Sequence, residues 1–163
     1  MAKNTISGYG VAELTKVASR KTGEIEAQAI LAEGIDTLEN GMVVYVDAKN
    51  NAIVLNAEDA DAAVDAPYLH FSNPRRYEEL KSGMKNFIYE RSEDYLPRLY
   101  KLTAGDIFVT NVVDTGDVLT AAGKAEVADG VLTLSESGLT GDFYIKPTTM
   151  PDGSKGFEVR YLG

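Results

Sequence analysis

The chain contains no cysteine, no tryptophan and only one histidine. Without cysteine it has no disulfide framework, no thiolate nucleophile and no zinc–thiolate site. Catalytic dyads and metal sites usually set histidine beside a nucleophile or a second ligand. His70 stands instead between Leu69 and Phe71, a setting typical of a half-buried strand residue. We therefore expect no catalytic residue, no metal site and no cofactor.

Long apolar runs are also missing. The first ten residues, MAKNTISGYG, have no apolar core of the kind a signal peptide needs. No stretch approaches the roughly 20 apolar residues of a membrane span. We expect a soluble chain that is made in the cytoplasm and does not bind membranes. Its 163 residues, 44% of them hydrophobic, suffice to bury a core in one domain or two small lobes.

The net charge of −9 is spread unevenly. Residues 1–21 carry four bases and one acid, whereas residues 22–65 carry ten acids and one lysine. An acidic surface repels phosphate, so the chain as a whole is not expected to bind nucleic acid directly. A basic leading segment ahead of an acidic body is suited to an acidic partner.

Familiar catalytic motifs are absent from the sequence. It holds no GxxxxGK[ST] phosphate loop, no GxSxG elbow and no HExxH motif. Residues 56–67, NAEDADAAVDAP, bring several acids together. A glycosidase needs two carboxylates, but this segment has no aromatic residues to hold a sugar. They also lack the mid-loop glycine and closing glutamate of a calcium loop. We expect a solvated acidic loop with one helical turn; a weak cation site and a hydrolase built on a carboxylate pair are alternatives.

Alternating and β-branched segments occupy most of the chain. Residues 41–55 predict a hairpin that turns at Asn50 and Asn51, since asparagine tolerates left-handed backbone angles. Residues 143–162 predict a terminal hairpin, and a short helix is expected to begin at Asn73 and Pro74. Further strands are expected over 24–31, 68–71, 86–91 and 95–113. The pattern predicts a mainly β protein, a small β-barrel or sandwich with short helices and an extended N-terminal arm.

The N-terminal segment, residues 1–23, admits two interpretations. VAELTKVASR places Val11, Leu14, Val17 and Ala18 on one side of a short helix, and RKTG is a typical helix end. One interpretation is an ordered first helix, and the other is an arm that becomes ordered on a neighbouring protein. Residues 24–163 would then form the β-rich body, with two lobes dividing near 95–116 as an option. Removing residues 2–21 is expected to leave the body folded and to weaken partner binding.

Three short segments place a leucine and a glycine just before an apolar strand. They are Leu38 to Met42, Leu102 to Asp106 and Leu139 to Asp142. Glycine supplies a positive φ, and leucine is expected to anchor each turn in the core. An aspartate after the glycine can accept bonds from backbone amides. These turns are predicted to be structural.

Aromatic and basic residues gather in the middle of the chain. The rings are Tyr68, Phe71, Tyr77, Phe87, Tyr89, Tyr95 and Tyr100. Tyrosine and arginine together are enriched in protein interfaces, but rings also fill cores. Alternation in NFIYER puts Phe87 and Tyr89 on one side and Ile88 on the other, so part of the cluster must be core. Both interpretations stay open for the remainder.

Two segments resemble accessory capsid proteins of tailed bacteriophages, the decoration or cement proteins. ILAEGIDTLENGMVVYVDAKNNAIVL resembles their leading β-barrel segment, and YLPRLYKLTAGDIFVTNVVD is similar to segments of small phage head proteins. The resemblance implies a non-enzymatic virion protein, made in the host cytoplasm, that binds the outer capsid surface and stabilises contacts between major capsid subunits. The implied partners are the major capsid protein and further copies of the chain, a trimer among the options.

The residues predicted to contact a partner come from the N-terminal segment and the aromatic middle. They are Tyr9, Val11, Leu14, Lys16, Val17, Arg20, Lys21, Arg75, Arg76, Tyr95, Arg98 and Tyr100. Alternative functions are another virion component, such as a tail or head-completion protein, and a carbohydrate-binding β module. The absence of tryptophan counts against the last.

Overall fold

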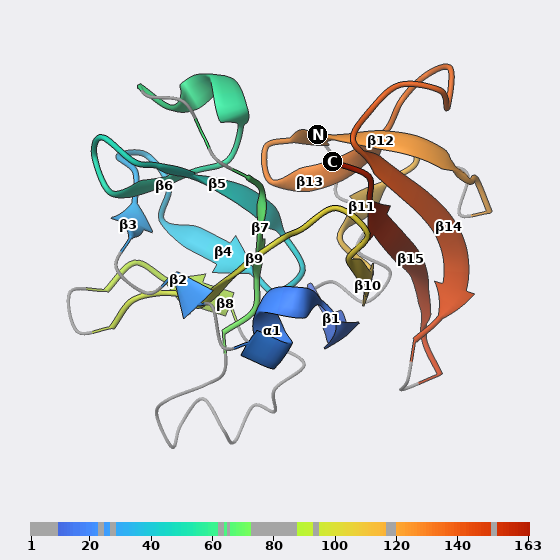
Figure 1. The fold of residues 1–163 in the computed structure, drawn as a ribbon, viewed down its shortest axis with the longest axis horizontal. Helices are drawn as coiled ribbons and strands as arrows, with labels where there is room; N and C mark the ends of the chain where they lie inside the picture. The colour runs from blue at the N-terminus through green and yellow to red at the C-terminus, as the bar shows by residue number, and fades with distance from the viewer. Residues whose placement is uncertain are drawn as a thin grey trace.

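The computed structural model shows a mainly β chain, as predicted (Figure 1). Among the described residues, the helical elements are the five-residue helix α1 (Ala18–Thr22) and the 3-10 turn η1 (Ala57–Asp59), which confirms the predicted turn in the acidic loop. No helix among the described residues is long and apolar enough to cross a membrane. The structure describes residues 10–22, 25–26, 29–61, 64, 66–72, 88–92, 95–116, 120–150 and 153–163.

One sheet has seven strands and contains the C-terminal third of the chain. All its neighbouring strands are antiparallel except β11 and β13, which run parallel. The β14–β15 pair is the predicted terminal hairpin, with seven residues in each strand. In spatial order the strands are β1 (Ala12–Lys16), β10 (Ile107–Thr110), β15 (Lys155–Tyr161), β14 (Phe143–Thr149), β12 (Gly123–Ala128), β13 (Val131–Leu134) and β11 (Val113–Asp114).

A second sheet of six short strands is formed by the first part of the chain. It includes the predicted hairpin of β5 and β6, where Asn51 has a φ of 54°. A separate antiparallel pair joins β4 (Thr37–Glu39) to β8 (Ile88–Glu90). The six strands in order are β2 (Ile25–Glu26), β9 (Leu99–Lys101), β7 (Tyr68–His70), β5 (Val43–Asp47), β6 (Ala52–Val54) and β3 (Ile30–Leu31).

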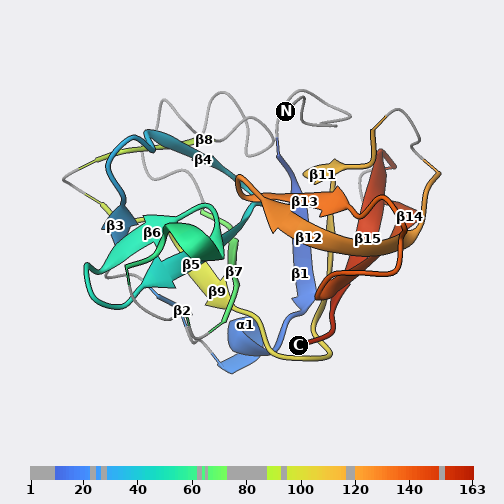
Figure 2. The ribbon, with the colours of Figure 1, turned by 90° about the horizontal axis from the view of Figure 1, so that it is seen from above.

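The two groups of strands lie side by side and share a core (Figure 2). Val43 and Leu69 of the six-stranded sheet pack in one apolar cluster with Phe108, Phe143 and Phe157 of the other. Backbone bonds also cross between them, because Gly130 in the β12–β13 turn accepts from the N–H of Val43 at 3.0 Å. Among the described strands neither sheet closes on itself, so the arrangement is sandwich-like and not a barrel.

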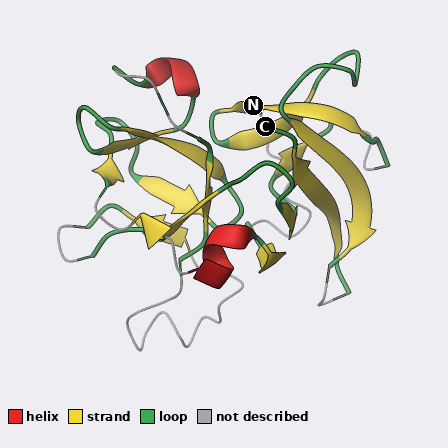
Figure 3. Cartoon of the chain, viewed as in Figure 1, coloured by secondary structure: helices red, strands yellow, loops and turns green. Residues whose placement is uncertain are grey.

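The predicted N-terminal helix is wrong for residues 12–16. They form β1, paired with β10 at the edge of the seven-stranded sheet, and the helix begins only at Ala18 (Figure 3). Ala12 and Leu14 point into the core with a period of two, and strand pairing satisfies backbone groups that a short isolated helix would leave to water. Removing residues 2–21 would therefore remove a strand and part of the core, contrary to the expectation that the body folds without them.

The glycines of the three leucine–glycine turns all have positive φ, as predicted: 93° at Gly41, 96° at Gly105 and 119° at Gly141. The leucines Leu38 and Leu102 are buried, but Leu139 is 76% exposed, so the predicted anchor is wrong there. Leu38 and Leu102 lie three residues before their glycine, whereas Leu139 lies two before it. In extended chain a change of one residue turns the side chain to the other side.

Candidate partner-binding surface

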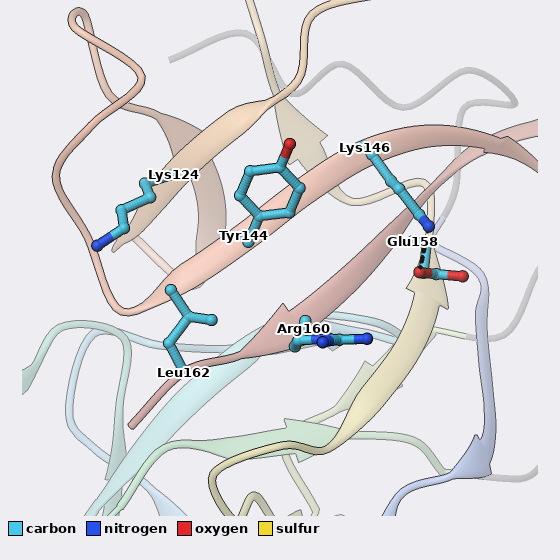
Figure 4. A pocket seen from close by; sticks show the side chains of 6 residues that line it. All are labelled: Lys124, Tyr144, Lys146, Glu158, Arg160 and Leu162. Atoms are coloured by element: carbon cyan, nitrogen blue, oxygen red, sulfur yellow. Dashed lines mark ion pairs between the residues drawn. The ribbon is translucent and has the colours of Figure 1, made fainter.

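The outward side of the seven-stranded sheet carries a concavity with a volume of about 440 Å³. We call it the basic sheet face. Figure 4 shows its side chains along β12, β14 and β15, with Tyr144 between Lys124 and Lys146 in that view. The residues that form it are Lys124, Tyr144, Lys146, Glu158, Arg160 and Leu162.

Strand alternation explains why these side chains point outward. On β14, Phe143 and Ile145 are buried in the core, so Tyr144 between them faces away from it. On β15, Phe157 and Val159 are buried in the same way, which turns Glu158 and Arg160 outward. The rings and β-branched residues beneath thus hold a row of polar side chains in fixed positions.

Strand register brings the members of the face together. Tyr144 lies opposite Lys124 on one side and opposite Arg160 on the other, while Lys146 lies opposite Glu158. Directly opposite residues in antiparallel strands have Cβ atoms about 5 Å apart. The face therefore holds an aromatic ring flanked by two cations, with an acid–base pair in the next row.

Charge on the face is only partly compensated. Lys146 Nζ lies 2.8 Å from Glu158 Oε1, an ion pair that neutralises both groups. Within the described part of the chain, neither Lys124 nor Arg160 forms an ion pair. Two cations thus stay uncompensated in a chain whose net charge is −9.

Apolar surface lies beside these cations. Tyr144 is 42% exposed and Leu162 is 39% exposed, two of the few large hydrophobic side chains with that much exposure among the described residues. Interfaces are typically built from aromatic and arginine side chains, with exposed apolar area at their centre. The basic sheet face has this composition.

The outward row extends beyond the concavity to the sheet edge. Ile107 lies opposite Arg160, and Lys16 of β1 lies opposite Ile107. Both Lys16 and Arg20 are exposed. Of the residues predicted to contact a partner, Lys16 is the one that strand pairing places in the same row as Arg160 and Tyr144.

No protein-family model, curated protein or solved structure matches this chain. The function of the basic sheet face therefore rests on its own chemistry.

Several residues predicted to contact a partner belong to the core instead. Leu14 and Val17 are 4% and 0% exposed, and Tyr100 is 8% exposed, so the prediction that they anchor a partner is wrong. Val11 is half-buried, and its N–H donates to Asn111 Oδ1 at 2.6 Å. An amphipathic strand and an amphipathic arm both require apolar residues, and only packing distinguishes them.

The described rings of the aromatic middle are buried or half-buried. Tyr89 is 1% exposed, its ring meets that of Tyr95 edge to face at 5.4 Å, and its hydroxyl donates to the Tyr95 carbonyl oxygen at 2.9 Å. The exposed Ile88 and buried Tyr89 confirm the predicted alternation for these two residues. Tyr95 and Arg98 are half-buried. The side chain of Lys21 and all of Tyr9, Arg75, Arg76, Phe87 and the predicted helix at 73–82 lie outside the described residues.

His70 is fully buried and part of a hydrogen-bonded network. Its Nδ1 lies 2.8 Å from the carbonyl oxygen of Glu39, which only accepts, so Nδ1 carries the proton. Nε2 then accepts from the Ser72 hydroxyl at 2.9 Å, and that hydroxyl accepts from the N–H of Arg98 at 2.9 Å. Burial lowers the pKa of His70 to about 4, although the bond to Glu39 opposes this. Both ring nitrogens of His70 thus have hydrogen-bond partners inside the core, and the ring does not face solvent.

Asp47 at the end of β5 and Asp61 of the acidic loop are held by the β5–β6 turn. Asp47 accepts from the N–H of Lys49 at 2.9 Å and from the Asn50 side chain at 2.7 Å. Burial alone would raise the pKa of Asp47, but these bonds together bring it below its ordinary value. Asp61 accepts from Asn50 and Lys49, which lowers its pKa as well. Among the described residues, no three histidine or carboxylate side chains are grouped to hold a metal ion.

Sequence reasoning missed the residues of the basic sheet face. The signal was present as alternation: FYIKP and FEVRY each place apolar residues at every second position, with Tyr144, Lys146, Glu158 and Arg160 between them. It predicts that these side chains point outward, but not that β12, β14 and β15 bring them side by side.

Proposed function

We propose that this chain is a non-enzymatic virion structural protein that binds the outer surface of a phage capsid and stabilises contacts between major capsid subunits. The observation that carries the proposal is the basic sheet face, where Lys124 and Arg160 flank the exposed ring of Tyr144 without an ion-pair partner in the described chain. The resemblance of two segments to phage decoration proteins points to the same class of function.

A sheet face of this size is suited to modest binding by each copy. It presents two uncompensated cations and two exposed apolar side chains, too few for a tight single site. A capsid lattice repeats the same contact many times, so avidity replaces the affinity of a single contact. The protein would lie across neighbouring capsid subunits and add buried area between them.

The buried polar groups support a structural role. His70 and Ser72 are buried and have hydrogen-bond partners within the core. Asp47 and Asp61 both accept hydrogen bonds from Lys49 and Asn50 of the β5–β6 turn. These arrangements stabilise a fold, which is consistent with a structural role.

Co-sedimentation with virus-like particles tests the proposal. The particles are assembled from the major capsid protein of the same genome, mixed with this chain, and analysed for stoichiometry. Hundreds of copies per particle are expected. A count near a dozen or fewer would replace the proposal by a portal, tail or vertex protein, and absence of association would overturn it.

One observation favours a second candidate, a carbohydrate-binding β module. Such modules use exposed aromatic rings on concave surfaces, and Tyr144 is an exposed ring on the concave sheet face. A glycan array distinguishes the two, since a capsid-binding protein is expected to retain no glycan.

A further inference from the structure

We infer that the basic sheet face binds an acidic polypeptide segment of the partner, with carboxylates at Lys124 and Arg160 and an apolar side chain over Tyr144 and Leu162. This inference rests on the proposed function and names the chemistry of the surface that the partner presents.

Charge complementarity is the first reason. The face holds three cations and one carboxylate, whereas the whole chain has a net charge of −9. An acidic segment is attracted to this local excess of positive charge, which orients the encounter with an otherwise acidic chain. Arg160 and Lys124 are uncompensated within the described chain, so the partner's carboxylates do not have to break an existing ion pair there.

The strand order determines how a segment can bind. β14 is hydrogen-bonded to β12 on one side and to β15 on the other, so its backbone has no open edge for an added strand. Contacts must be made by side chains. Lys124 and Arg160 lie two strand spacings apart, about 10 Å, with Tyr144 midway.

That spacing fits an extended segment with an acid, an apolar residue and an acid on one side. Same-side residues of an extended chain repeat about every 7 Å, so acids on either side of an apolar residue are about 13 Å apart. The long side chains of Lys124 and Arg160 can span the difference between the spacing of the two strands and the spacing of the two acids. The apolar residue then lies over the ring of Tyr144 and against Leu162.

Glu158 explains why a peptide fits better than a nucleic acid or a sulfated glycan. Its carboxylate lines the face, and Oε1 forms an ion pair with Lys146 Nζ at 2.8 Å. Because Glu158 neutralises Lys146, a continuous polyanion finds no uncompensated cation in this row of the face. Two discrete carboxylates need only Lys124 and Arg160 of the neighbouring row.

The test is a titration of the full chain with a labelled peptide of three Glu-Thr-Leu-Thr repeats, followed by fluorescence anisotropy. The control peptide carries Gln in place of each Glu. The double variant Lys124→Glu/Arg160→Glu is expected to bind the acidic peptide about tenfold more weakly. The matched variant Lys49→Glu/Lys155→Glu makes the same charge change at exposed cations outside the concavity and is expected to bind normally.

A gain of binding provides a second measurement that misfolding cannot imitate. Glu158→Gln removes the carboxylate and leaves Lys146 unpaired, so the acidic peptide is expected to bind about threefold more tightly. Equal binding of the Glu and Gln peptides, or weaker binding by Glu158→Gln, would overturn the inference. Tighter binding of oligothymidylate or heparin than of the acidic peptide would overturn it too and assign the face to polyanions.

Particle binding separates this inference from the proposed function. If wild type and the Lys124→Glu/Arg160→Glu variant co-sediment equally with particles, the function stands and the assigned face is wrong. If the acidic peptide binds but particles do not, the chemistry of the face stands and the capsid function is wrong.

Discussion

The Asp106 carboxylate accepts a hydrogen bond from the N–H of Ala18 at 2.9 Å, across 88 residues of sequence. Its other oxygen accepts from the N–H of Thr103 at 2.9 Å. One side chain, 6% exposed, therefore holds both the turn before β10 and the start of α1. The predicted turn aspartate thus has a second, long-range contact.

Replacing Asp106 by Ala leaves two backbone N–H groups without their acceptor. We expect the free energy of unfolding to fall by about 2–3 kcal/mol, measured by urea denaturation. Asp114→Ala is the matched control, because Asp114 accepts one bond, from the N–H of Gly116, at an exposed turn. An equal effect of the two substitutions would show that the contact with Ala18 contributes nothing.

Replacing Leu14 by Ala tests whether β1 belongs to the folded core. Leu14 is 4% exposed, so we expect a loss of about 2–4 kcal/mol in the free energy of unfolding. Lys16→Ala, on the same strand but exposed, is expected to change stability little. Similar unfolding curves for both variants would restore the interpretation of this segment as a separate arm.

Stability is expected to fall as pH decreases from about 6.5 to about 4, because of His70. Unfolded imidazole takes up a proton near 6.5, whereas burial holds the pKa of His70 at about 4 in the native state. The unfolded state thus binds more protons in this window, and the loss amounts to about 3 kcal/mol below it. The hydrogen-bonded Asp47 and Asp61, whose pKa values are lowered, contribute only at more acidic pH.

Proton NMR checks this pH dependence without ambiguity, since the chain has a single histidine. The imidazole resonance is expected to stay at its neutral position until the pH approaches 4. A native-state titration centred near 6.5 would contradict the buried network with Glu39 and Ser72.

Gly141 and Gly105 both have positive φ but differ in the space around them. A Cβ on Gly141 would clash with the carbonyl oxygen of Ala125, whereas nothing lies within 4 Å of one on Gly105. We expect Gly105→Ala to destabilise by about 1–2 kcal/mol and Gly141→Ala by about 3 kcal/mol or more. Thermal unfolding compares them, and equal losses would contradict the close packing of this turn on β12.

Local signals in the sequence predicted the mainly β class, the two hairpins and the glycine turns. In these cases the cause is local: Asn51, Gly41 and Gly105 adopt positive φ because of their own chemistry. Alternation of Phe143 and Ile145 with Tyr144 likewise determines which side chains face the core, whatever the strand pairs with.

Tertiary structure alone decided which strands are neighbours. Residues 12–16 are a strand because β10 offers an edge and the core accepts Leu14, although their apolar residues also suit a short helix. The basic sheet face exists because register aligns Lys124, Tyr144 and Arg160 across three strands. Register depends on the packing of the whole core, and no short stretch of sequence contains it.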